Sequence, residues 1–167
     1  MTCPSLILAA WALLPTWYGD RHESTDTRDA HRLPVATAIC RATTDAKERK
    51  FLATQAYSET TLARYVIDDR CSDGPVGARC DEGRATGPWQ VHRSMARCAR
   101  NAWDKSLPVT ERYLAGAQCA LANWRYGVAR CKSDAGGFAA QGGVLVKCGA
   151  AWARRRVALM ERIGGRL

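Results

Sequence analysis

A single glutamate in the middle of an apolar stripe is the residue of this chain best placed to do chemistry. Leu52, Ala56, Glu59, Ala63 and Val66 recur at spacings of four and three residues, so they share one face of a helix. An ionised carboxylate is costly to bury without partners, and burial favours its protonated form. A carboxyl that keeps its proton can donate it to a glycosidic oxygen. The pattern indicates a general acid, and the alternative is a structural ion pair with one of the many arginines.

A tight turn, Gly87-Pro88-Trp89-Gln90, follows twenty-eight residues after Glu59. Gly87 lets the backbone approach a ligand closely, and Trp89 supplies a flat face that can stack on a pyranose ring or pack beneath it. The stretch from Asp68 to Thr86 is rich in Gly and indicates a loop or a short hairpin. Glu59 and this turn are the two halves of the candidate site.

The two halves together resemble the lysozyme-like superfamily, in particular the lytic transglycosylases and the goose-type and chicken-type lysozymes. Ser58-Glu59-Thr60-Thr61 stands where that family has its catalytic Glu near the end of a helix. Gly87-Pro88-Trp89-Gln90 stands where it has a Gly-Leu-Met-Gln or Gly-Ile-Leu-Gln turn, although Pro and Trp replace the aliphatic pair. The resemblance implies that Glu59 is the acid/base, and that Thr86, Gly87, Trp89 and Gln90 bind the sugar.

A weaker match lies further along the chain. The element Asn123-Trp124-Arg125-Tyr126-Gly127 is similar to the Ala-Tyr-Asn-Ala-Gly element of lytic transglycosylases, whose Tyr faces the acid across the cleft. The resemblance implies that Tyr126 binds the substrate or contacts Glu59, but the Asn that should follow it is missing. The alternative is a Tyr packed in the core.

The resemblance favours a lytic transglycosylase over a hydrolase. Chicken-type lysozymes carry a second carboxylate just before the Gly of the turn, where this chain has Ala85 and Thr86. Lytic transglycosylases cleave the β-1,4 bond between N-acetylmuramic acid and N-acetylglucosamine with one acid/base, and form a 1,6-anhydro ring without metal or organic cofactor. Hydrolysis by a lysozyme stays open, since a carboxyl separation cannot be read from sequence. A non-catalytic wall-binding protein, for instance part of a phage or secretion assembly, is a further alternative.

Composition and charge narrow the partners. The chain has 167 residues, 47% of them hydrophobic, which is typical of one globular domain, and a formal net charge of +9. The charge favours an anionic partner, either peptidoglycan glycan strands or nucleic acid. We find no zinc finger, no phosphate-binding loop and no RNA-binding aromatic signature, so nucleic-acid binding is not expected.

Eight cysteines indicate disulfides and an oxidising compartment. None forms a C-x-x-C pair and only three His are present, so a metal site is not expected. The spacing predicts the pairs Cys71–Cys80 and Cys119–Cys131. The protein would then be secreted, periplasmic or virion-associated; the alternative is free buried thiols in a cytosolic protein.

Residues 1–16 form an apolar segment that is too short to span a bilayer as a helix, so no stable membrane span is expected. The segment is either a signal peptide or the first helix of the domain. The resemblance implies that residues 17–167 form a lysozyme-like catalytic domain. The predicted fold is mainly α, a single domain with a small loop or β-hairpin lobe beside the active-site cleft.

Several helix boundaries can be predicted as well. Asp45 and Glu48 resemble a capping box at the start of the Glu59 helix, and Pro34 suits the first turn of an earlier one. Further helices are expected over 93–105, from 107 to about 124, and over 148–163, and the Gly-rich stretch 133–143 is expected to be a surface loop.

Overall fold

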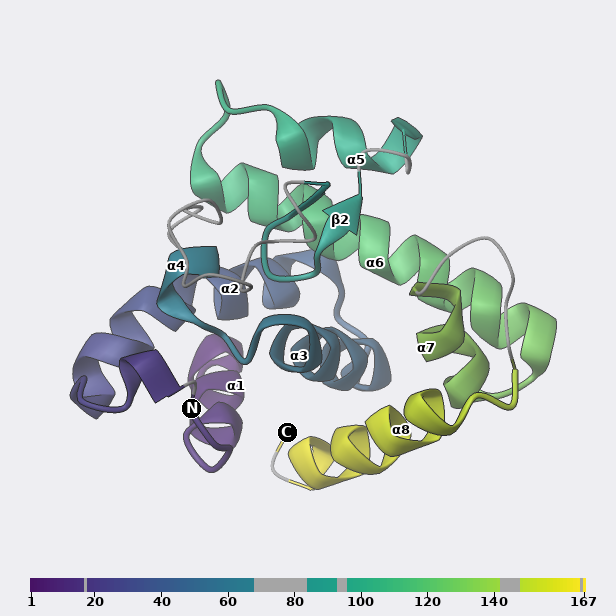
Figure 1. Cartoon of the computed structure of the whole chain (residues 1–167), viewed down its shortest axis with the longest axis horizontal. Helices are drawn as coiled ribbons and strands as arrows, with labels where there is room; N and C mark the ends of the chain where they lie inside the picture. The colour runs from purple at the N-terminus through teal and green to yellow at the C-terminus, as the bar shows by residue number, and fades with distance from the viewer. Residues whose placement is uncertain (17, 68–83, 93–95, 142–147, 166) are drawn as a thin grey trace.

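The computed structural model describes residues 1–16, 18–67, 84–92, 96–141, 148–165 and 167, and these are mainly helical (Figure 1). This confirms the predicted mainly α class. The helices are α1 (Cys3–Trp11), α2 (Thr25–Ala42), α3 (Ala46–Thr60), α4 (Arg64–Ile67), α5 (Ala96–Trp103), α6 (Val109–Cys131), α7 (Asp134–Gln141) and α8 (Ala151–Gly164), with a short 3-10 helix at Tyr18–Asp20. Strands β1 (Ala85–Thr86) and β2 (Val91–His92) pair antiparallel as a small hairpin.

Helix α3, which carries Glu59, lies at the centre of the molecule. Figure 1 shows it almost end-on, with α6 crossing above it and α8 passing below. It contacts α2, α6 and α8, and α6 in turn packs against α2, α5 and α7. Phe51, Leu52, Ala53 and Ala56 of α3 are fully buried, so this helix supplies the middle of the hydrophobic core.

Helix α1 belongs to the same core. Ile7 and Trp11 are 1% exposed, and the indole Nε1 of Trp11 donates a hydrogen bond to the carbonyl of Ala53 at 3.2 Å. A disulfide joins Cys3 to Cys40 of α2. In the structure, α1 is therefore part of the packed domain, and N-terminal sequencing of the mature protein tests whether it is retained.

Helix α2 begins at Thr25, whereas the sequence pattern predicted a start near Pro34, nine residues later. Ser24 caps it, since its hydroxyl accepts a hydrogen bond from the Thr27 N–H at 3.1 Å. Pro34 lies inside the helix. A proline there leaves the carbonyl four residues earlier without its usual donor, and that residue, Ala30, is exposed to water. The prediction was wrong because a solvated helix face tolerates the proline.

The Gly-rich stretch 133–143, predicted as a loop, contains helix α7. Its glycines allow close contact with α6. A Cβ atom on Gly137 would lie 2.3 Å from the Trp124 ring, and one on Gly127 would lie 2.2 Å from the Gly136 carbonyl oxygen. The loop prediction was wrong because glycine here serves helix packing rather than chain flexibility.

The described residues contain three disulfides: Cys3–Cys40, Cys98–Cys119 and Cys131–Cys148. The predicted Cys119–Cys131 pair is wrong. Both cysteines lie on α6, which continues to Cys131 instead of ending near Trp124, so about 18 Å of helix separates them. Cys71 and Cys80 lie outside the described residues. The disulfides themselves are compatible with an oxidising compartment.

Within the described ranges, no helix is both long and apolar enough to cross a membrane.

Candidate active site

Glu59 lies in the last turn of α3, because the helix ends one residue later. The Thr60 hydroxyl accepts a hydrogen bond from the Leu62 N–H at 3.0 Å, and Thr61 and Leu62 have left-handed backbones with φ of 49° and 55°. The predicted stripe through Ala63 and Val66 on one continuous helix is therefore wrong. The chain resumes as α4, whose first N–H, on Arg64, donates to the Asp20 carboxylate at 2.9 Å.

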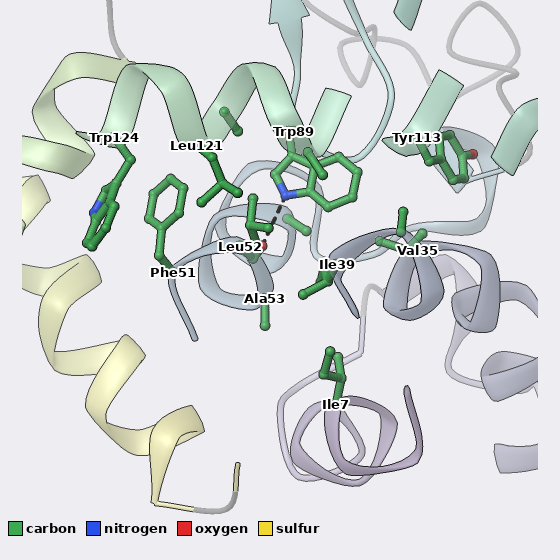
Figure 2. Close-up of a cluster of buried hydrophobic side chains, with 14 of the residues drawn as sticks. Ile7, Val35, Ile39, Phe51, Leu52, Ala53, Trp89, Tyr113, Leu121 and Trp124 are labelled. Carbon is green, nitrogen blue, oxygen red and sulfur yellow. Dashed lines mark hydrogen bonds between the residues drawn. The ribbon is translucent and has the colours of Figure 1, made fainter. Parts of the chain in front are cut away.

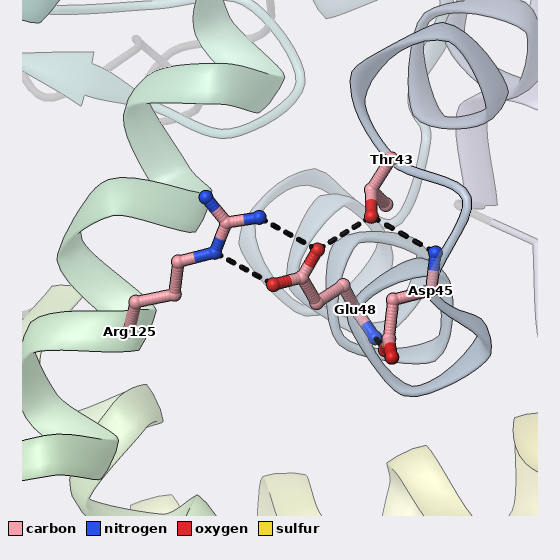
Figure 3. Close-up of polar contacts among 4 residues, drawn as sticks. All are labelled: Thr43, Asp45, Glu48 and Arg125. Atoms are coloured by element: carbon pink, nitrogen blue, oxygen red, sulfur yellow. Dashed lines mark hydrogen bonds and ion pairs between the residues drawn. The ribbon is translucent and has the colours of Figure 1, made fainter.

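The other end of α3 is anchored to α6 (Figure 3). Asp45 caps the helix as predicted, since its carboxylate accepts the Glu48 N–H at 2.8 Å. The second hydrogen bond of a capping box, from the Asp45 N–H to the Glu48 carboxylate, is replaced by one from the Asp45 N–H to the Thr43 hydroxyl oxygen. The Glu48 carboxylate binds Arg125 through two contacts, at 2.6 and 2.9 Å, and also accepts the Thr43 hydroxyl. The hydrogen bond from Arg125 holds the pKa of Glu48 below its ordinary value.

The turn after Glu59 connects β1 to β2. Thr86 faces Val91 in the hairpin register, and Gly87 to Gln90 form the loop between them. Gly87 has φ of 68° and Gln90 has φ of 48°, so both ends of the loop are left-handed. The Gln90 side-chain amide donates a hydrogen bond to the Gly87 carbonyl at 2.9 Å, which closes the turn.

Trp89 packs beneath this turn and does not offer an exposed face. It is 4% exposed, and its Nε1 donates to the carbonyl of Leu52 on α3 at 3.1 Å. Figure 2 shows the indole among the side chains of Leu52, Leu121 and Ile39. Of the two alternatives for Trp89, stacking on a sugar or packing beneath it, the burial excludes the first. Thr86 is also buried, at 5% exposure.

Glu59 itself forms a compact polar cluster with α8. Its Oε1 accepts the side-chain amide of Gln55 at 2.8 Å and lies 2.7 Å from Nη1 of Arg156. The same Nη1 donates to the carbonyl oxygen of Gln55 at 3.1 Å, and the guanidinium lies 4.9 Å from the ring centre of Trp152. The Glu59 side chain is 24% exposed. The expected burial in apolar surroundings is therefore wrong, and the arrangement is the ion pair weighed as its alternative.

Tyr126 is not brought to Glu59. It is 57% exposed, so the alternative of a Tyr packed in the core is wrong, and substrate binding by Tyr126 stays a prediction. Its neighbour Trp124 stacks on Phe51 with ring centres 5.0 Å apart, and Arg125 pairs with Glu48. Both contacts lie in the N-terminal half of α3. Glu59 is eleven residues beyond Glu48, or about 16 Å along the helix axis.

Two hollows lined by described residues share Arg112 and Tyr113, and neither borders Glu59. One, of about 10 Å³, lies between the turn and Tyr113. Another, of about 320 Å³, opens between α2 and α6 beside Pro34, and His31, Arg112 and Tyr113 supply its polar lining. No group of three His, Cys, Asp or Glu side chains among the described residues could hold a metal ion.

Sequence reasoning missed the three residues around Glu59: Gln55, Trp152 and Arg156. Gln55 precedes Glu59 by four residues on the same helix, a spacing that could have signalled the contact. Arg156 stands in the run Arg154-Arg155-Arg156, and no local pattern distinguishes the arginine that turns inward from its two exposed neighbours.

Comparisons with protein-family models, with curated proteins and with solved structures give no significant match to this chain.

Proposed function

We propose that this protein cleaves peptidoglycan glycan strands, with Glu59 as the acid/base of a lytic transglycosylase reaction. The observation that carries the proposal is the hydrogen bond from Trp89 to Leu52, which docks the Gly87–Gln90 turn on the helix of Glu59. Leu52 and Glu59 are seven residues apart, so they share a helix face about 10 Å apart along its axis. That separation is of the size of two sugar rings.

The left-handed residues support the same proposal. Thr61 and Leu62 lie two and three residues after Glu59, and Gln90 ends the turn. Such backbones are costly for residues other than Gly and persist where the surrounding structure enforces them, often at functional sites. They hold the carboxyl and the turn in defined positions.

The reaction needs one carboxyl. Protonated Glu59 donates its proton to the glycosidic oxygen as the bond from that oxygen to the muramic acid C1 breaks. The substrate's N-acetyl group assists departure of the leaving sugar. The muramic acid 6-hydroxyl then bonds to C1 and gives its proton to the Glu59 carboxylate, which restores the acid. No water is consumed, and the product carries a 1,6-anhydro ring.

A non-catalytic wall-binding role is the second candidate, and the ion pair between Glu59 and Arg156 favours it. Arg156 and Gln55 already occupy the Glu59 carboxylate, as in a structural ion pair. The position of Tyr126, which is not brought to Glu59, also favours the non-catalytic role. In this case the protein would bind glycan strands without turnover, and its net charge of +9 would retain it on an anionic wall.

Purified sacculi separate these candidates. We expect the protein to release muropeptides whose mass analysis shows 1,6-anhydro ends; reducing muramic acid ends would identify a hydrolase. Glu59→Gln should abolish release and keep its circular dichroism spectrum. The matched control is Glu111→Gln, which also breaks an arginine pair, to Arg41 at 2.8 Å, but on the surface between α2 and α6. Binding to sacculi with no released fragment would support the non-catalytic role.

A further inference from the structure

The guanidinium of Arg156 uses only one of its nitrogens toward Glu59 and Gln55. Both contacts, at 2.7 and 3.1 Å, involve Nη1. Within the described part of the chain, Nε and Nη2 make no hydrogen bond. The arginine side chain is 21% exposed, so solvent reaches it. The residue therefore keeps donors available beside the Glu59 carboxyl.

The free donors have the geometry that a carboxylate requires. Nε and Nη2 of an arginine lie on one edge of a planar group and present two parallel N–H bonds, which match the two oxygens of a carboxylate. The ring of Trp152, 4.9 Å from the guanidinium carbon, limits how the plane can turn. Gln55, at 1% exposure, holds the Nη1 side in place.

We propose that the Nε–Nη2 edge of Arg156 is a carboxylate-binding subsite, which makes the protein prefer glycans with an acidic substituent over neutral ones. The inference rests on the proposed function, since peptidoglycan is the glycan in question. Its carboxylates have two sources, the lactyl group of a bare muramic acid and the attached stem peptide.

Binding of short glycans tests the subsite without turnover. The disaccharide N-acetylglucosaminyl-N-acetylmuramic acid lacks the bond that the proposed reaction cleaves. Its free acid, its neutral methyl amide and its conjugate with one L-alanine can be titrated by calorimetry. We expect the free acid or the alanine conjugate to bind about tenfold more tightly than the amide. The stronger of the two identifies the source of the carboxylate.

Three variants localise the preference. Arg156→Gln should lose it, so that the charged and neutral ligands bind equally. Arg156→Lys should keep part of it, because an ammonium supplies charge without the two-donor edge. Arg155→Gln is the matched control: it removes the same charge from the next, exposed position of α8 and should bind like the wild type.

Equal affinity of the wild-type protein for charged and neutral ligands would overturn the subsite, and so would an unchanged preference in Arg156→Gln or no binding of any ligand. If Arg156→Gln does not fold, the wild-type comparison and Arg156→Lys decide. Charge-dependent binding without cleavage of sacculi would remove the enzymatic proposal and keep the subsite. Cleavage of sacculi without charge-dependent binding would keep the enzymatic proposal and remove the subsite.

Discussion

The indole Nε1 of Trp89 donates a hydrogen bond to the backbone carbonyl of Leu52 at 3.1 Å, thirty-seven residues away in the chain. Leu52 lies inside α3, so its carbonyl oxygen accepts the Trp89 hydrogen bond in addition to the backbone hydrogen bond of the helix (Figure 2). Through this contact the hairpin is fixed to the helix that carries Glu59.

Replacing Trp89 with Phe tests that contact. The variant loses the hydrogen bond and part of a buried ring, so its free energy of unfolding should fall by about 2–3 kcal/mol. If the proposed function holds, release of fragments from sacculi should fall as well. The matched control is Trp103→Phe, which loses a hydrogen bond of 3.0 Å to Val91 on a half-buried ring and should cost less stability. Equal losses in urea denaturation would show that Trp89 is not the stronger anchor.

Gly137→Ala tests the close packing of α6 against α7. The added methyl group would lie 2.3 Å from the buried Trp124 ring, and neither helix can move without disturbing the core. We expect a loss of about 1–3 kcal/mol in the free energy of unfolding. Gly149→Ala is the control, because its nearest atom, at 3.9 Å, is the end of the flexible Arg154 side chain. A thermal melt of Gly137→Ala that matches the wild type would contradict the close approach.

The Glu48–Arg125 pair should give a pH-dependent contribution to stability. The arginine lowers the pKa of Glu48 in the folded state, so the pair stabilises the fold above the ordinary Glu pKa and loses its effect as pH falls through the lowered value. Arg125 is 60% exposed, so Arg125→Gln should cost only about 0.5 kcal/mol at pH 7. The difference from wild type should shrink as pH falls below the ordinary Glu pKa of about 4.3, and it should vanish once pH is below the lowered pKa of Glu48.

Denaturation curves across this pH range measure the effect, and the Glu48→Gln background provides the control. In that background Arg125→Gln should have no pH-dependent effect, because the titrating partner is gone. A cost that stays constant from pH 7 to pH 3 would show that Arg125 acts through packing of its stem rather than through the charge pair.

The disulfide between Cys3 and Cys40 should be the strongest of the three described crosslinks. It closes a loop of 37 residues, against 21 for Cys98–Cys119 and 17 for Cys131–Cys148. On the loop-entropy account, replacing both Cys3 and Cys40 with Ser should cost about 4 kcal/mol, and the same change at Cys131 and Cys148 about 3 kcal/mol. Peptide mapping without reductant checks the pairing itself, and a Cys119–Cys131 peptide would contradict the structure.

Features that depend on neighbours in the chain could be predicted from sequence. The mainly α class, the cap at Asp45, the tight turn at Gly87–Gln90 and the final helix all follow from local composition and spacing. Each rests on a few consecutive residues whose backbone preferences agree. Local preference was misleading where a proline or a glycine had a tertiary role, as Pro34 inside α2 and Gly137 beneath Trp124 show.

The environment of Glu59 was decided by tertiary structure alone. Its place on the helix of Leu52 and Ala56 could be predicted from the sequence, but the end of that helix at the left-handed Thr61 and the approach of α8 could not. Arg156 is ninety-seven residues away, and its neighbours in the Arg run face the solvent. Charge and polarity at a carboxyl are set by whichever side chains the folded chain brings within a few ångströms, and residues that distant in sequence meet only when the helices pack.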